Sequence, residues 1–178
     1  MTHTPANHPS ITSRSVEYSN HHLQPFRHAL VGHGPSGSDL IVRVSFTCHV
    51  YSKMDTAQAI EFRFIDEGRR WREFCPVRHL ASVDLPALCR TMMNENFPSW
   101  LSKDRNGQSN MAITERQPTS GSRYAVFYYL YPSRAKNIHV EFVVKSAYRL
   151  EIDMAHYRKR ELVKSLLKTC YYKQKAIP

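Results

Sequence analysis

RYAVFYYLY at 123–131 and IHVEFVVKSAYRL at 138–150 are the two stretches that decide the expected fold. Both are rich in the β-branched and aromatic residues that favour strands. The residues between them, PSRAKN at 132–137, favour a turn. A third β-rich segment at 111–116 is followed by a second turn, PTSG at 118–121. The three segments therefore predict an antiparallel meander.

The alternation of side chains predicts how the last two strands pair. A regular hairpin closed by residues 132–137 places Tyr131 opposite Ile138. One face is then apolar and would meet the helices, through the pairs Tyr129 with Val140, Phe127 with Phe142, and Ala125 with Val144. The other face carries Leu130 with His139, Tyr128 with Glu141, Val126 with Val143, and Tyr124 with Lys145.

The rest of the chain supplies two earlier strands and two helices. Apolar and polar residues alternate at 40–50 and again at 60–65, as in half-buried strands. Asp84 precedes a run of helix formers with Pro86 in the first turn, which predicts a helix over 85–96. Apolar residues at helical spacing predict a last helix over 154–172. This order indicates an α+β fold, an antiparallel sheet with helices packed on one face.

The chain reads as a single domain with two appendages. Its 178 residues suit one core, built over 40–172. Residues 1–39 are rich in His, Pro, Ser and Gly without an apolar period, which predicts a flexible arm whose histidines are solvated. Residues 173–178 form a basic tail, and 102–110 cross the surface as a polar segment.

Composition narrows the class of protein and the compartment. The chain has no apolar run long enough to span a membrane and no secretory leader at its N-terminus, so we expect a cytoplasmic protein without a membrane partner. Its four cysteines lack paired spacing, which argues against a disulfide framework or a zinc ribbon. Neither metal nor cofactor is expected. GHGPSG at 32–37 has the glycine spacing of a dinucleotide-binding loop, but a strand is expected after it where that loop needs a helix, so we interpret it as a linker. CPVRH at 75–79 is interpreted as a structural corner.

Positive charge is the strongest functional signal. The formal charge is +10, and more than half of it lies in the last 25 residues, on the expected helix and tail. A polyanion such as RNA or DNA, or an acidic protein, is the expected partner. We expect this helix to lie beside Tyr148 and Arg149. The cationic residues assigned to nucleic-acid binding there are Arg158, Lys159, Arg160, Lys164 and Lys168.

The polar face of the hairpin is the candidate site. Tyr124 and Tyr128 would stack on unpaired bases, while imidazole or carboxylate groups would move protons. The alternative is an ordinary solvent-facing sheet, in which tyrosines and charged residues are common.

Two strand segments, SRYAVFY at 122–128 and VVKSAYR at 143–149, lie within the expected order of a helix, a meander and a basic helix over 85–172. This order and these segments resemble the RelE/ParE superfamily of bacterial toxins and its BrnT-like members. In size the chain also resembles the accessory toxins of retron-type defence modules. The resemblance implies a metal-independent endoribonuclease that acts on RNA, often on the ribosome, and is neutralised by an antitoxin, a protein or a protein–nucleic-acid complex. It implies His139 or Tyr148 as base or acid, and Arg123, Lys145 and Arg149 as stabilisers of phosphorane charge.

Two other functions stay open on the sequence. One is a non-catalytic module that binds nucleic acid or an acidic protein through its basic residues. The other is an inhibitor or structural protein of a phage or mobile element, whose charge serves assembly. RNA that is bound but left uncut would favour the first, and capture of an acidic protein without nucleic acid would favour the second.

Overall fold

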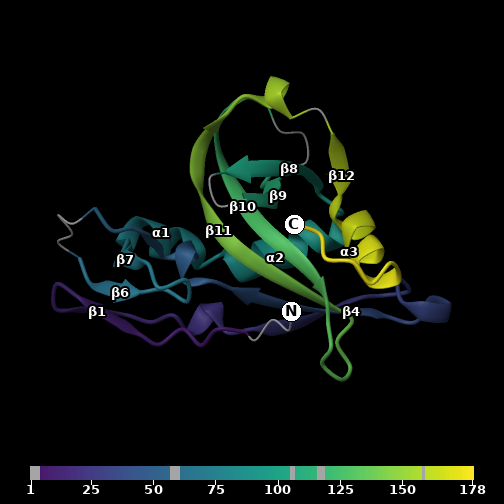
Figure 1. Cartoon of the computed structure of the whole chain (residues 1–178), viewed down its shortest axis with the longest axis horizontal. Helices are drawn as coiled ribbons and strands as arrows, with labels where there is room; N and C mark the ends of the chain where they lie inside the picture. The colour runs from purple at the N-terminus through teal and green to yellow at the C-terminus, as the bar shows by residue number, and fades with distance from the viewer. Residues whose placement is uncertain (1–4, 57–60, 105–106, 116–118, 158) are drawn as a thin grey trace.

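The computed structural model describes residues 5–56, 61–104, 107–115, 119–157 and 159–178 (Figure 1). A seven-stranded sheet has the strand order β12-β8-β9-β10-β11-β4-β3. Its strands are β3 (Phe26–Leu30), β4 (Leu40–Phe46), β8 (Pro98–Asp104), β9 (Gly107–Ile113), β10 (Gly121–Pro132), β11 (Val140–Ile152) and β12 (Arg160–Leu162). The pair β11–β4 is parallel and the other pairs are antiparallel.

Smaller elements surround this sheet. A three-stranded sheet has the order β5-β7-β6, and β1 pairs with β2. These strands are β1 (Ile11–Ser13), β2 (Val16–Tyr18), β5 (Ser52–Met54), β6 (Arg63–Ile65) and β7 (Trp71–Phe74). The helices are α1 (Pro76–Ser82), α2 (Leu85–Asn94) and α3 (Val163–Tyr172), and the 3₁₀ turn η3 covers Cys48–Val50. None of the helices in the described parts of the chain is long and apolar enough to cross a membrane.

The main core lies between the large sheet and helices α2 and α3. Met92 of α2 and Leu167 of α3 are fully buried in the same apolar cluster as Leu130 and Phe142 of the long β10–β11 hairpin. Figure 1 shows this hairpin curving past both helices. A smaller apolar cluster around Phe127 covers part of the opposite face. The expected α+β class, a sheet with helices on one face, is therefore confirmed.

The pairing of β10 with β11 differs from the expected register. Pro132 lies opposite Val140, so the connecting loop is one residue longer than the turn that the sequence suggested. Because side chains alternate along a strand, this odd shift exchanges the two faces. Tyr128 turns into the core opposite Val144, and Tyr129 turns outward. Closer to the other end, Phe127 lies opposite Ser146, so Lys145 is the inserted residue of a β-bulge.

The N-terminal segment is folded where the structure describes it, which corrects the expected flexible arm. Strand β3 pairs with β4 along its whole length, and Leu23 and Leu30 are buried in the core. His8 is buried as well, with Nε2 2.9 Å from the carbonyl oxygen of Phe46. Burial lowers the pKa of His8. The segment has no visible period because its strands are only three to five residues long.

The C-terminal helix is shorter than expected. It begins at Val163, after the edge strand β12, so Lys159 and Arg160 precede it; Arg158 lies outside the described residues. The tail also has a fixed place, since Ile177 and Leu130 exchange backbone hydrogen bonds of 2.8 and 2.9 Å.

The sequence did not predict helix α1 or strands β1, β2, β3, β5, β7, β8 and β12, and it displaced one strand. Strand β8 and the start of β9 occupy the expected polar crossing. Helix α1 begins at Pro76, which fits because proline at the first helical position loses no hydrogen bond. The second expected strand appears as β6, and its expected first residue, Ile60, lies outside the described residues.

Candidate functional site

The candidate site lies along the edge of β11, at the point where β4 leaves it. Strand β4 pairs with β11 only as far as Val144. Thr47 directly follows the last residue of β4. Its backbone N–H donates to the Val144 carbonyl (3.0 Å), and its Oγ1 donates to the Lys145 carbonyl (2.6 Å). Turn η3 and helix α1 then contact β11 in place of a strand. Two pockets open along this edge.

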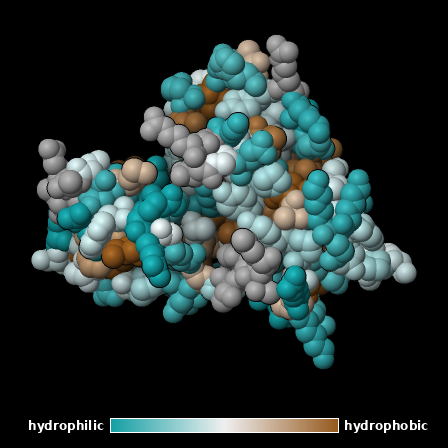
Figure 2. Space-filling view, in the orientation of Figure 1, coloured by the Kyte–Doolittle hydropathy of each residue, from teal (hydrophilic) through white to brown (hydrophobic). Residues whose placement is uncertain are grey.

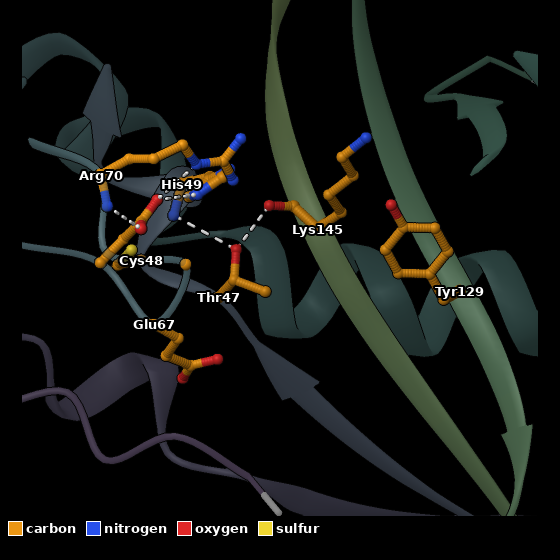
Figure 3. Close-up of a pocket in the computed structure, with 9 residues that line it drawn as sticks. Thr47, Cys48, His49, Glu67, Arg70, Tyr129 and Lys145 are labelled. Carbon is orange, nitrogen blue, oxygen red and sulfur yellow. Dashed lines mark hydrogen bonds and ion pairs between the residues drawn. The ribbon is translucent and has the colours of Figure 1, made fainter. Parts of the chain in front are cut away.

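The first, which we name the His49 pocket, has a volume of about 350 Å³ (Figure 3). It draws side chains from η3, from the loop between β6 and β7, and from both strands of the long hairpin. Its lining residues are Thr47, Cys48, His49, Asp66, Glu67, Gly68, Arg70, Tyr129 and Lys145.

An imidazole and a carboxylate are paired in this pocket. Nε2 of His49 lies 3.1 Å from Oδ2 of Asp66, and the backbone N–H of Arg70 donates to Oδ1 of Asp66 (2.9 Å). Burial would raise the pKa of Asp66, but the hydrogen bonds from Arg70 and His49 and the charge of Arg70 bring it below its ordinary value. Burial and the charge of Arg72 lower the pKa of His49 despite its partner. An ionised Asp66 and a neutral His49 are therefore favoured at neutral pH.

Lys145 and Tyr129 form the opposite wall. Nζ of Lys145 lies 5.6 Å from the centre of the Tyr129 ring, on the neighbouring strand. Figure 3 shows both side chains across the pocket from His49. The bulge at Lys145 aims this side chain, as bulges beside functional sites often do. Burial raises the pKa of the Cys48 thiol to about 11, which disfavours a thiolate nucleophile here.

The second cavity, which we name the Tyr148 pocket, measures about 320 Å³ and lies between β11 and α1. The guanidinium of Arg78 stacks over the Tyr148 ring at 4.6 Å. Its Nη1 also donates to the Ser52 carbonyl (2.7 Å) and to that of His49 (3.4 Å), so Arg78 connects the two pockets. The lining residues, none with a carboxylate, are Cys75, Val77, Arg78, Ala81, Tyr124, Tyr148 and Arg149.

Four of the residues singled out in the sequence meet at this edge. Tyr124, Tyr148 and Arg149 line the Tyr148 pocket, and Lys145 lines the His49 pocket. The hydroxyl of Tyr124 donates to the Ala81 carbonyl (3.2 Å), and burial raises its pKa to about 12.

Other expected site residues lie elsewhere. Tyr128 is fully buried, stacked on Phe142 at 4.4 Å, with its hydroxyl donating to Oγ of Ser99 (2.7 Å), so it offers no face to a base. This corrects its assignment to nucleic-acid binding, and the register shift explains it. Nδ1 of His139 accepts the Ile41 N–H (2.9 Å), and its ring lies 5.0 Å from that of Tyr171.

Arg123 stands near the opposite end of the hairpin from His139. Its guanidinium donates to the Thr119 carbonyl (3.1 Å) and lies 3.4 Å from the Glu115 carboxylate. The expected catalytic set of His139, Lys145, Tyr148 and Arg123 is therefore spread along the hairpin, and only Lys145 and Tyr148 lie beside the two pockets.

The basic C-terminal residues form a separate surface. Lys164 and Lys168 lie on α3, which packs on the helical side of the sheet, and Arg160 lies on the edge strand β12. Nζ of Lys159 is 3.3 Å from Glu161. Tyr148 and Arg149 contact α1 rather than this helix, contrary to expectation.

Sequence reasoning missed His49, Asp66, Arg70, Arg78 and Tyr129. No spacing connects His49 with Asp66, because a loop and two strands of a different sheet bring them together. Arg78 lies inside the CPVRH segment, which was interpreted as a structural corner and forms the start of helix α1. Tyr129 was assigned to the buried face because the expected register paired it with Val140, whereas it lies opposite Val143.

Comparison with known proteins corrects the expected family. The chain matches the model of the YjaZ family over residues 10–171, which includes the N-terminal strands that a RelE/ParE or BrnT-like toxin assignment leaves out. Neither a curated protein nor a solved structure matches it significantly. The toxin resemblance was therefore wrong, because it rested on a short order of elements and two unspecific strand motifs. The chain belongs to the YjaZ family.

Proposed function

We propose that this chain binds single-stranded RNA along the β11 edge. The observation that carries the proposal is the Tyr148 pocket, which combines Arg78, Arg149 and two tyrosines without a carboxylate. Proteins hold unpaired bases against aromatic rings and guanidinium planes, and they hold phosphates with cationic side chains. The charge of +10 supports attraction of a polyanion over longer distances.

The two cationic surfaces have different roles in this proposal. In the Tyr148 pocket, Arg78 and Arg149 take a base and the adjoining phosphate, because the Tyr148 ring is already in contact with the Arg78 guanidinium (4.6 Å) and with the Phe127 ring (5.3 Å). The exposed residues Lys159, Arg160 and Lys168 attract the strand without fixing its register. Growth arrest and neutralisation by an antitoxin rested on the toxin resemblance, and they are not part of the proposal.

Arg149→Ala is expected to weaken binding of a short fluorescent single-stranded RNA about tenfold, because it removes one charge-assisted hydrogen bond to phosphate. The slope of log affinity against log salt should become less steep by about one unit or less. Fluorescence anisotropy at several salt concentrations measures both. Lys136→Ala, an exposed cation in the hairpin loop, is the matched control. Equal losses in the two variants would leave only non-specific attraction and contradict the proposed pocket.

Cleavage of the bound RNA is a second candidate function, favoured by the His49–Asp66 pair. A neutral His49 that donates from Nε2 to Asp66 keeps the Nδ1 lone pair as a base. It would take the proton of a 2′-hydroxyl, whose oxygen attacks the adjacent phosphorus as the bond to the 5′-oxygen breaks. Lys145 would stabilise the phosphorane charge, and water would protonate the leaving oxygen. The products are a 2′,3′-cyclic phosphate and a 5′-hydroxyl.

His49→Gln is expected to slow this cleavage by about 100-fold with little change in RNA affinity, because a general base contributes at least that factor. Since burial and the charge of Arg72 lower the pKa of His49, the base form persists at neutral pH, and the rate should fall only at a pH lower than that at which an ordinary imidazole gains its proton. Electrophoresis of end-labelled RNA in EDTA measures the rate. His156→Gln, an exposed histidine, is the control. Intact RNA after incubation with the wild-type protein would remove this candidate and leave the binding function.

A further inference from the structure

A third cavity of about 350 Å³ opens on the other side of the Asp66–Glu67 turn, and we name it the Phe64 pocket. It shares Cys48, Asp66 and Glu67 with the His49 pocket but faces the N-terminal segment and the three-stranded sheet. Its apolar walls come from Ile11, Tyr51, Phe62, Phe64 and Ile65. Neither the RNA surface nor the proposed cleavage step uses these walls.

The walls are aromatic and partly uncovered. The rings of Phe62 and Phe64 stack at 6.2 Å, and Tyr51 lies 6.1 Å from Phe64. Phe62 is 45% exposed and Ile65 is 56% exposed, so apolar surface beside the cavity faces solvent. Figure 2 shows hydrophobic residues at the surface of the lobe that contains β6 and β7. An apolar ligand would gain free energy by covering this surface.

One wall is fixed by a buried histidine. Nε2 of His8 lies 2.9 Å from the Phe46 carbonyl oxygen and Nδ1 lies 3.3 Å from the Tyr51 hydroxyl. The ring also packs edge-on against Tyr51 at 5.5 Å. Burial lowers the pKa of His8, which keeps the imidazole uncharged at neutral pH. The pocket is therefore preformed on this side and carries no positive charge there.

The charge of the Phe64 pocket is opposite to that of the protein. Lys and Arg outnumber Asp and Glu by 25 to 15 in the chain, yet the lining residues in the described part of the chain include Asp66 and Glu67 and neither Lys nor Arg. Asp66 is already held by His49 and Arg70. Glu67 is exposed, and its charge acts on the buried His8 and Tyr51. A carboxylate beside three aromatic rings attracts a cation and repels phosphate.

We propose that the Phe64 pocket binds a small organic cation with an apolar body, such as an arylalkylamine. The ammonium group would pair with the Glu67 carboxylate and contact the aromatic faces, while the apolar body would cover Phe62 and Ile65. This site uses neither Arg78 nor Arg149, which carry the RNA-binding proposal, but it shares the Asp66–Glu67 turn with the His49 pocket.

Isothermal titration calorimetry with 2-phenylethylammonium chloride and with the neutral isostere 2-phenylethanol tests the charge preference. The amine is expected to bind at least about fivefold more tightly than the alcohol, as a cation–π contact and a carboxylate partner together predict. Equal affinities, or no heat from either probe up to its solubility limit, would overturn the proposal.

Glu67→Gln tests the contribution of the carboxylate to binding separately from the contribution of the apolar cavity. This variant should weaken amine binding about fivefold and leave alcohol binding unchanged, whereas Glu17→Gln, an exposed residue on β2, should change neither. Phe64→Leu should weaken binding of both probes, which places them in this cavity. Unchanged amine affinity in both Glu67→Gln and Phe64→Leu would overturn the site even if the wild type binds. An RNA-binding measurement on the same samples is a separate readout that decides the other proposal.

Discussion

Replacing Tyr128 with alanine is expected to lower the free energy of unfolding by about 3–5 kcal/mol, the range for loss of a buried aromatic side chain. Tyr128 is fully buried between the sheet and the helices, and its ring stacks on that of Phe142. The substitution leaves a cavity and also removes the hydrogen bond to Ser99. Urea denaturation followed by circular dichroism measures the change.

Tyr128→Phe isolates the hydroxyl and should cost about 1–2 kcal/mol, because the ring still fills its site. It should leave RNA affinity unchanged, since Tyr128 lies on the covered face. A matched variant is Tyr129→Ala, on the next position of the same strand but on the pocket side. If Tyr128→Ala destabilised the chain no more than Tyr129→Ala, the register described for β10 and β11 would be incorrect.

Glu141→Ala is expected to lower the free energy of unfolding by about 3 kcal/mol, the lower end of the range for breaking a buried ion pair. The Glu141 side chain is only 4% exposed and accepts hydrogen bonds of 2.8 and 2.7 Å from Arg43. Its Oε1 also accepts from Oγ of Ser133 (2.6 Å). Removing it leaves a mostly covered guanidinium without that carboxylate, at the contact between β4, β11 and the hairpin loop. Chemical denaturation again gives the measurement.

The same strand provides the control for Glu141. Glu151 is exposed near the end of β11, and Glu151→Ala should change the free energy of unfolding by about 0.5 kcal/mol or less. Adding Arg43→Leu to Glu141→Ala should recover part of the loss, because it removes the stranded charge. Equal stabilities of the Glu141→Ala and Glu151→Ala variants would show that the ion pair does not hold the two strands together.

The long hairpin shows how far the sequence could predict this fold. Its two strands were recognisable because aromatic and β-branched residues persist over many positions on both sides of a clear turn. The assignment of side chains to the two faces could not be predicted, because a loop longer by one residue exchanges the faces. Both registers would bury a set of apolar side chains. The alternating run from Tyr124 to Tyr131 has aromatic residues on both faces, so composition could not choose between them.

The candidate site was only partly visible for a similar reason. Lys145, Tyr148 and Arg149 were found because they lie within five residues of one another on one strand. His49 and Asp66 are ordinary residues in sequence, and their pairing depends on how a loop of the small sheet folds against η3. The N-terminal segment was misjudged because strands of three to five residues carry too few positions to reveal a period.

The parallel pairing of β4 with β11 has a consequence for how the chain folds during synthesis. The contacts that join these strands, including Arg43 with Glu141 and Thr47 with Lys145, connect residues 98 positions apart. Such a high contact order slows folding, since the intervening chain must close a large loop before the contacts form. On the ribosome, β4 emerges with one edge lacking its native neighbour until β11 has been translated. During that interval the β3–β4 ribbon offers a strand edge to other chains, so chaperone capture and aggregation compete with completion of the sheet.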